Sequence, residues 1–94
     1  MYGIIANCNY SDDNGNADNL AISCAAKAVE CGWTDDADLV AALDTLEETL
    51  AEYADNPHIH AVNACRAAER AVLKAWTDDV QAEIEAVKTA CYRD

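Results

Sequence analysis

The chain has 94 residues, with 18 Asp or Glu against six Lys or Arg, and its formal net charge at pH 7 is −12. A chain of this length forms one domain and buries only about 60 to 70% of the surface that its unfolded state exposes. The negative charge excludes direct binding of nucleic acid and favours a basic partner. The sequence has no run of about 18 apolar residues, and its start lacks the basic region and the long apolar region of a signal peptide. We therefore expect a cytoplasmic protein without a membrane span.

The first 18 residues are expected to form an extended arm followed by a loop. Residues 2–10 are a short apolar stretch that predicts a strand or an arm lying over the rest of the protein, whereas residues 11–19 are turn-forming. Polar side chains alternate from Asp12 to Asp18 as at the start of a calcium loop. Ala17 stands where that loop needs Gly, and the closing Glu is missing, so a solvated loop is the expectation.

Four helices are predicted after this loop, over residues 19–31, 35–54, 57–75 and 78–92. The third is predicted to start with Asn56 as its N-cap and Pro57 as its first residue. The second should bury a ridge of large side chains spaced by four or three residues: Leu39, Leu43, Leu46, Leu50 and Tyr53.

These elements predict an all-α fold in a single domain, residues 1–94. The expected architecture is a four-helix bundle made of two repeated helical hairpins, residues 19–54 and 55–94, preceded by the arm and loop of residues 1–18.

A 16-residue segment occurs twice. Residues 21–36 and 64–79 are identical at eight of sixteen aligned positions, including an unbroken Trp-Thr-Asp-Asp block. A Thr oxygen can cap a helix, and two acids in the first turn favour its positive end. Each block is therefore predicted to be a corner between two helices, with Thr34 and Thr77 as N-caps, the Trp packed at the corner, and Gly32 providing the first turn.

The five cysteines are expected to be reduced, because their number is odd and no two form a CxxC pair. Cys65 and Cys91 continue apolar stripes at helical spacing, so we expect both thiols to be buried as small hydrophobic groups.

No catalytic signature was found. His58 and His60 are two residues apart, a spacing that places them on different sides of a helix and does not suit a paired zinc site. The sequence has no serine nucleophile motif and no glycine-rich phosphate loop. A non-enzymatic protein without a cofactor or a metal is therefore the expectation.

The second predicted helix carries a row of carboxylates, and no Lys or Arg occurs between residues 28 and 65. Neighbours in such a row repel each other by a few tenths of a kcal/mol per pair. A regular row of negative charge is also what a protein lined with Lys and Arg binds in a nucleic-acid backbone. The predicted partner-binding residues are Asp44, Glu47, Glu48, Glu52 and Asp55, together with Asp35, Asp36 and Asp38 at the helix start.

A small, acidic, helical protein of this kind resembles phage and mobile-element inhibitors, namely antirestriction DNA mimics and anti-CRISPR proteins. The resemblance rests on size, acidity and the row from Asp44 to Asp55, and on no alignable motif. It implies an inhibitor that occupies the nucleic-acid site of a basic, nucleic-acid-handling host protein, in the host cytoplasm if the gene belongs to a phage.

Other interpretations remain open at the level of sequence. An immunity or adaptor module could bind a protein through the mixed-charge face of Arg66, Arg70 and Lys74, and a small metal-binding protein is a further alternative. An acidic or halophilic proteome also produces such surfaces. A homodimer would cover an exposed apolar face.

Overall fold

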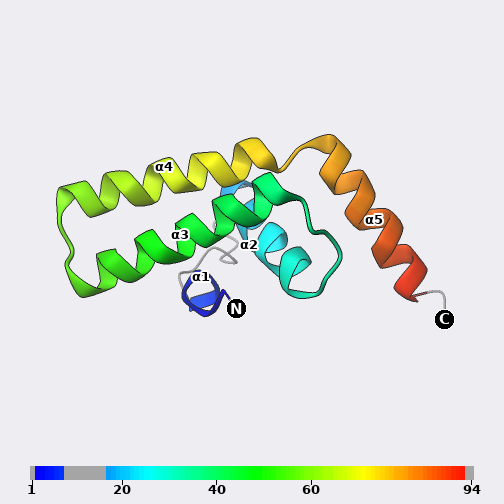
Figure 1. The fold of residues 1–94 in the computed structure, drawn as a ribbon, viewed down its shortest axis with the longest axis horizontal. Helices are drawn as coiled ribbons and strands as arrows, with labels where there is room; N and C mark the ends of the chain where they lie inside the picture. Colours follow the sequence, from blue (N-terminus) through cyan, green and yellow to red (C-terminus); the bar gives the residue numbers. More distant parts are fainter. Residues whose placement is uncertain (1, 8–16, 93–94) are drawn as a thin grey trace.

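The computed structural model describes residues 2–7 and 17–92, with side chains for residues 2–5 and 20–90 (Figure 1). The described residues form helices and turns, which confirms the all-α class. None of the described helices is long and apolar enough to cross a membrane. The helices are α1 (Gly3–Asn7), α2 (Ala17–Glu30), α3 (Ala37–Asp55), α4 (Ile59–Ala75) and α5 (Asp78–Tyr92).

The prediction of an extended N-terminal arm is wrong, because residues 3–7 form the short helix α1. Tyr2 and Ile5 enter the core and are only 1% and 2% exposed. A short apolar stretch does not by itself separate a strand from a buried helical turn, and here contacts with α3 favour the helix. The predicted loop over residues 8–16 lies outside the described residues.

The closest helix pair is the antiparallel hairpin of α3 and α4. Leu39, Leu43, Leu46 and Leu50 of α3 are buried, as predicted. They face a stripe of mostly small side chains on α4, which lets the two helices approach closely: Ala61, Cys65, Ala68 and Val72.

Tyr53 was predicted to be buried with those leucines, but it is 41% exposed. Helices α1 and α2 lie away from the turn that joins α3 to α4, so no further helix covers α3 at Tyr53 in the described part of the chain (Figure 1).

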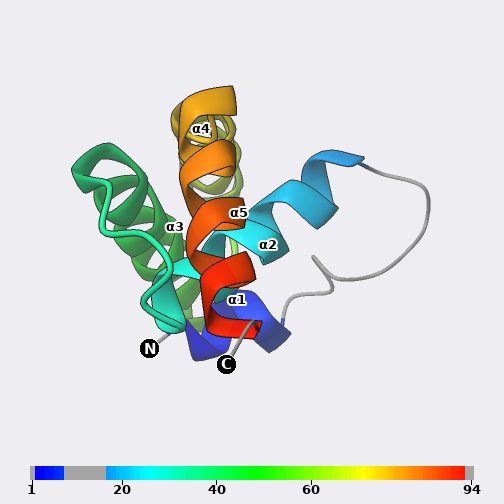
Figure 2. The same ribbon diagram turned by 90° about the vertical axis from the view of Figure 1, so that its right-hand side faces the viewer.

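The predicted pairing into hairpins 19–54 and 55–94 differs from the structure, in which the hairpin joins the second predicted helix to the third. Helix α2 crosses behind the α3–α4 pair, and α5 runs away from it (Figures 1 and 2). Within the described residues α5 packs closely along none of the other helices. The physical reason is that, among its described side chains, α5 buries Val80 and Ile84 alone, a ridge too short for a second tight hairpin.

The two Trp-Thr-Asp-Asp blocks do form corners between helices, but a different residue of the block caps the following helix in each. At the first corner the N-cap is Asp36, whose carboxylate accepts from the Leu39 N–H at 3.0 Å, and not Thr34. Thr34 is only 6% exposed, and its hydroxyl accepts from the Asp36 N–H at 3.3 Å. At the second corner the Thr77 hydroxyl accepts from the Val80 N–H at 3.2 Å, as predicted for an N-cap. Gly32 has φ 73°, the left-handed conformation expected of it.

The third predicted helix starts later than expected. Its N-cap is His58, whose Nδ1 accepts from the Ala61 N–H at 3.3 Å, and not Asn56. Asn56 instead ends α3, where its N–H donates to the Glu52 carbonyl. Pro57 therefore lies in the turn and not in the first turn of α4.

Candidate functional site

The predicted carboxylate row lies along α3 on the side away from the buried leucines. Asp44, Glu48, Glu52 and Asp55 are all exposed, and Glu47 is half-buried at the flank of the row. The row therefore exists as a surface of α3, but two of its members have partners inside the protein.

Asp44 and Glu47 hold the N-terminal segment. The Tyr2 hydroxyl donates to Asp44 at 3.0 Å. The two oxygens of Glu47 accept from the N–H groups of Ile4 and Ile5 at 2.8 and 3.0 Å. These donors belong to the first turn of α1, where no intrahelical acceptor exists, so Glu47 satisfies them in place of a cap.

A third carboxylate completes this attachment, since Glu30 at the end of α2 accepts from the Tyr2 N–H at 2.7 Å. Sequence reasoning missed the attachment, because it depends on contacts between residues 28 to 43 positions apart. The available signal was that no Lys or Arg occurs between residues 28 and 65, the stretch that contains all three acids.

The same three carboxylates perturb Tyr2. Burial, the hydrogen bond to Asp44 and the nearby charges of Asp44, Glu30 and Glu47 together raise the pKa of Tyr2 to about 12. The phenol therefore stays neutral at ordinary pH. Asp44 and Glu47 thus accept hydrogen bonds from neutral donors.

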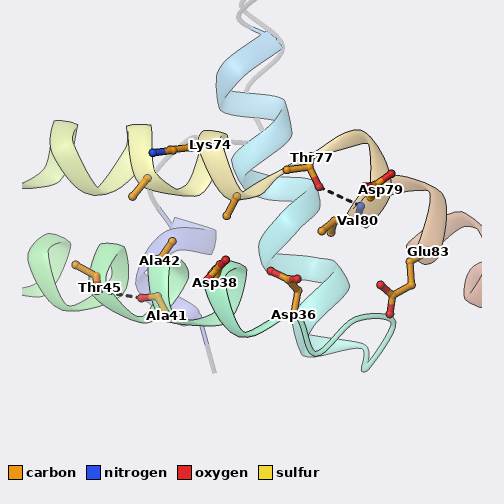
Figure 3. A pocket seen from close by; sticks show the side chains of 12 residues that line it. Asp36, Asp38, Ala41, Ala42, Thr45, Lys74, Thr77, Asp79, Val80 and Glu83 are labelled. Carbon is orange, nitrogen blue, oxygen red and sulfur yellow. Dashed lines mark hydrogen bonds between the residues drawn. The ribbon is translucent and has the colours of Figure 1, made fainter.

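The predicted residues at the start of α3 belong to a different surface. Asp36 and Asp38 line a cavity of about 720 Å³ at the junction of α3, α4 and α5. Figure 3 shows carboxylates around it from both sides, with Asp79 and Glu83 on α5. Asp35 is exposed in the preceding turn.

This cavity also holds one positive side chain, Lys74 from α4 (Figure 3). Three of its four acids, Asp36, Asp38 and Asp79, lie at helix starts, where they favour the positive end of the helix. Within the part of the chain that the structure describes, no group of three or more His, Cys, Asp or Glu is placed to hold a metal ion.

The far end of the carboxylate row meets the two histidines at the α3–α4 turn. Glu52 and Asp55 line a cavity of about 370 Å³ together with His58 and His60. The two imidazole rings lie edge to face at 5.8 Å between centroids. Because His58 Nδ1 already caps α4, that nitrogen has a structural role.

The cysteine predictions are confirmed in part. Cys65 is 8% exposed and its thiol is free. Cys24 and Cys31 are also free, but they are exposed on the surface of α2 and its C-terminal turn. Cys8 and the side chain of Cys91 lie outside the described residues.

A third hollow, between α2 and α5, was not predicted. It has a volume of about 510 Å³, and both tryptophans of the chain line it, one from each copy of the repeat. The repeated Trp was the available signal, but the sequence interpretation placed each Trp only at its own corner.

Taken together, fold and surfaces define a small all-α protein with a row of carboxylates on its central hairpin and an apolar groove beside its last helix. No protein-family model, no curated protein and no solved structure matches this chain.

Proposed function

We propose that this protein is a non-enzymatic acidic inhibitor that binds a basic, nucleic-acid-handling protein by nucleic-acid mimicry, in the manner of phage antirestriction and anti-CRISPR proteins. The observation that carries the proposal is the row Glu48, Glu52 and Asp55, which is exposed on α3 with no Lys or Arg on that helix.

The spacing of this row suits a partner that binds a charged polymer. Residues four and three apart on a helix lie about 5 to 6 Å from one another on one face. A Lys-rich or Arg-rich groove that follows regularly spaced phosphates can pair with such a row, and the net charge of −12 steers it over a long range.

Asp44 and Glu47 have a revised part in the proposal. Both are occupied by donors of Tyr2 and α1, so direct contact with a partner is assigned to the other three carboxylates. Since their hydrogen-bond donors are neutral, both side chains still contribute to the negative field that attracts a basic protein. Asp35, Asp36 and Asp38 contribute to that field from the start of α3.

The experiment is affinity capture of bacterial proteins on the immobilised full chain, at about 50 mM and about 200 mM salt. Basic nucleic-acid-binding proteins should be retained at the lower salt, and duplex DNA added in solution should release them. The variant Glu48→Gln, Glu52→Gln, Asp55→Asn should retain far less of them, chiefly because association slows.

A matched control removes three exposed carboxylates from α5 through Asp78→Asn, Asp79→Asn and Glu83→Gln. It changes the net charge by the same amount and should retain most of the captured protein. If both triple variants lose capture equally, only the overall charge matters and the row on α3 is not the contact surface.

An adaptor function through α4 is the second candidate. Arg66, Arg70 and Lys74 are all exposed on that helix, and Ile59 at its start is 66% exposed, so this face has the apolar and mixed-charge character of a protein-binding surface. This function would be favoured by proteins that stay bound at high salt and that the α3 triple variant also captures. The double variant Arg66→Ala, Arg70→Ala should fail to capture them.

A further inference from the structure

The groove between α2 and α5 has aromatic walls supplied by the repeat. Trp33 and Trp76 are equivalent residues of the two copies, and each lies at its own corner and lines the same groove. The Gln81 amide donates to the Trp76 carbonyl at 3.3 Å and ties this second corner to α5. Ala28 and Ile84 form an apolar floor, at 1% and 6% exposure.

The charge of the groove is opposite to that of the molecule. Among the described residues that line it are two of the six Lys and Arg residues of the chain, Lys27 and Lys88, and one acid, Glu85. The Lys88 ammonium lies 5.5 Å from the centroid of the Trp33 ring, so its charge is held over the groove wall. A locally positive, aromatic hollow therefore exists in a chain of net charge −12.

We propose that this groove binds a small apolar organic acid, with the hydrocarbon body against the two tryptophans and Ile84 and the carboxylate between Lys27 and Lys88. The volume of about 510 Å³ lies within the range typical of small-molecule sites. This site lies on a different surface from the carboxylate row, and the inference does not depend on the proposed inhibitor function.

Charge decides between the classes of occupant. An uncharged apolar ligand would cover two ammonium groups without pairing them, which disfavours binding. A polyanion or an acidic protein would be repelled by the net charge of the whole molecule. A ligand with one negative charge pairs the lysines and meets the least repulsion.

The first test uses 10-bromodecanoate as the probe, because bromine quenches tryptophan fluorescence on contact and Trp33 and Trp76 are the only tryptophans. Titration of the full-length protein should give saturable quenching. The uncharged analogue 10-bromodecanol should bind with an affinity lower by about tenfold or more. Absence of quenching, or equal quenching by the alcohol, would overturn the proposal.

The second test locates the carboxylate. The double variant Lys27→Gln, Lys88→Gln should weaken 10-bromodecanoate binding about tenfold or more. The control Arg66→Gln, Arg70→Gln makes the same change in net charge on α4, outside the groove, and should leave the affinity unchanged. If the two pairs weaken binding equally, the probe is held by general charge and the proposed site is wrong.

The third test uses the two exposed thiols of α2 and its C-terminal turn. Cys24 lines the groove and Cys31 does not. Saturating decanoate should slow the reaction of Cys24 with a thiol reagent at least several-fold and leave Cys31 unaffected, as followed by mass spectrometry of labelled peptides. This readout does not require any variant to fold. Equal labelling of Cys24 with and without decanoate would place the ligand elsewhere.

Discussion

Asp35 and Asp36 are neighbours in sequence, but their side chains have different roles. The Asp36 carboxylate caps α3, whereas Asp35 is exposed in the turn before it. Capping chemistry alone predicted a corner here but could not choose the capping residue, because Thr and Asp both accept from backbone N–H groups. Burial of Thr34 against the core shifts the start of α3 by two residues compared with the second copy of the repeat.

We predict that Asp36→Ala lowers the free energy of unfolding by about 1 kcal/mol, the typical effect of losing an N-cap. Asp35→Ala, the matched control, should leave it nearly unchanged. Urea denaturation followed by circular dichroism measures both. Equal effects of the two substitutions would contradict the assignment of Asp36 as the cap.

Because of Tyr2, the free energy of unfolding should depend on pH in the alkaline range. Its pKa is about 12 in the folded state against an ordinary value of 10. Below pH 10 both states keep the phenol proton, and the stabilisation is fully present. Between these values the unfolded state loses the proton while the folded state keeps it, so the free energy of unfolding falls as pH rises.

The variant Tyr2→Phe isolates this effect, because the other tyrosines, the lysines and the arginines are common to both proteins. The wild type should be more stable than Tyr2→Phe below pH 10, and this advantage should shrink steadily toward pH 12. Denaturation curves for both proteins across that range provide the measurement. An advantage that is constant with pH would mean that Tyr2 ionises equally in both states.

At the scale of elements, α5 is attached more weakly than the α3–α4 hairpin. It buries Val80 and Ile84, and its remaining described contacts include Lys88 over Trp33. Helices with few buried apolar contacts open at a lower free energy than the whole protein. We therefore expect α5 amides to exchange hydrogen with solvent faster than those of α3 and α4.

Native-state hydrogen exchange tests this order with two substitutions. Ile84→Ala should speed exchange within α5 and leave α3 nearly unaffected, whereas Leu43→Ala, which opens the main core, should speed exchange in every helix. If α5 and α3 exchange at the same free energy in the wild type, the two elements unfold as one unit and the prediction is wrong.

The positions of the helices in the sequence were largely predictable, but which helices pack against each other was not. The bounds expected for α5 match the structure, because Thr77 and the two acids after it mark its start in the sequence. The helix α1 was missed, since a five-residue segment carries too little periodicity to separate it from a strand.

At the scale of the whole molecule, the sequence was enough to place the carboxylates on one side of α3. It was not enough to identify the groups that donate hydrogen bonds to them. The row follows from helical spacing, whereas the attachment of Tyr2 to Asp44 follows from how α1 docks on α3. The groove was beyond prediction for the same reason, since its lining residues come from α2, α5 and the two corners, which are far apart in the sequence.

The attachment of α1 also sets an order of folding. Its hydrogen bonds to α3 join residues 42 and 43 apart, whereas α3 and α4 are joined by a turn of three residues. Since local contacts form with the smaller loss of chain entropy, the hairpin should assemble first and α1 should dock after the rate-limiting barrier. In stopped-flow kinetics, Glu47→Ala should therefore accelerate unfolding and barely change refolding, and Leu43→Ala should slow refolding. A refolding rate that falls with Glu47→Ala would show instead that the N-terminal residues are already in place at the barrier.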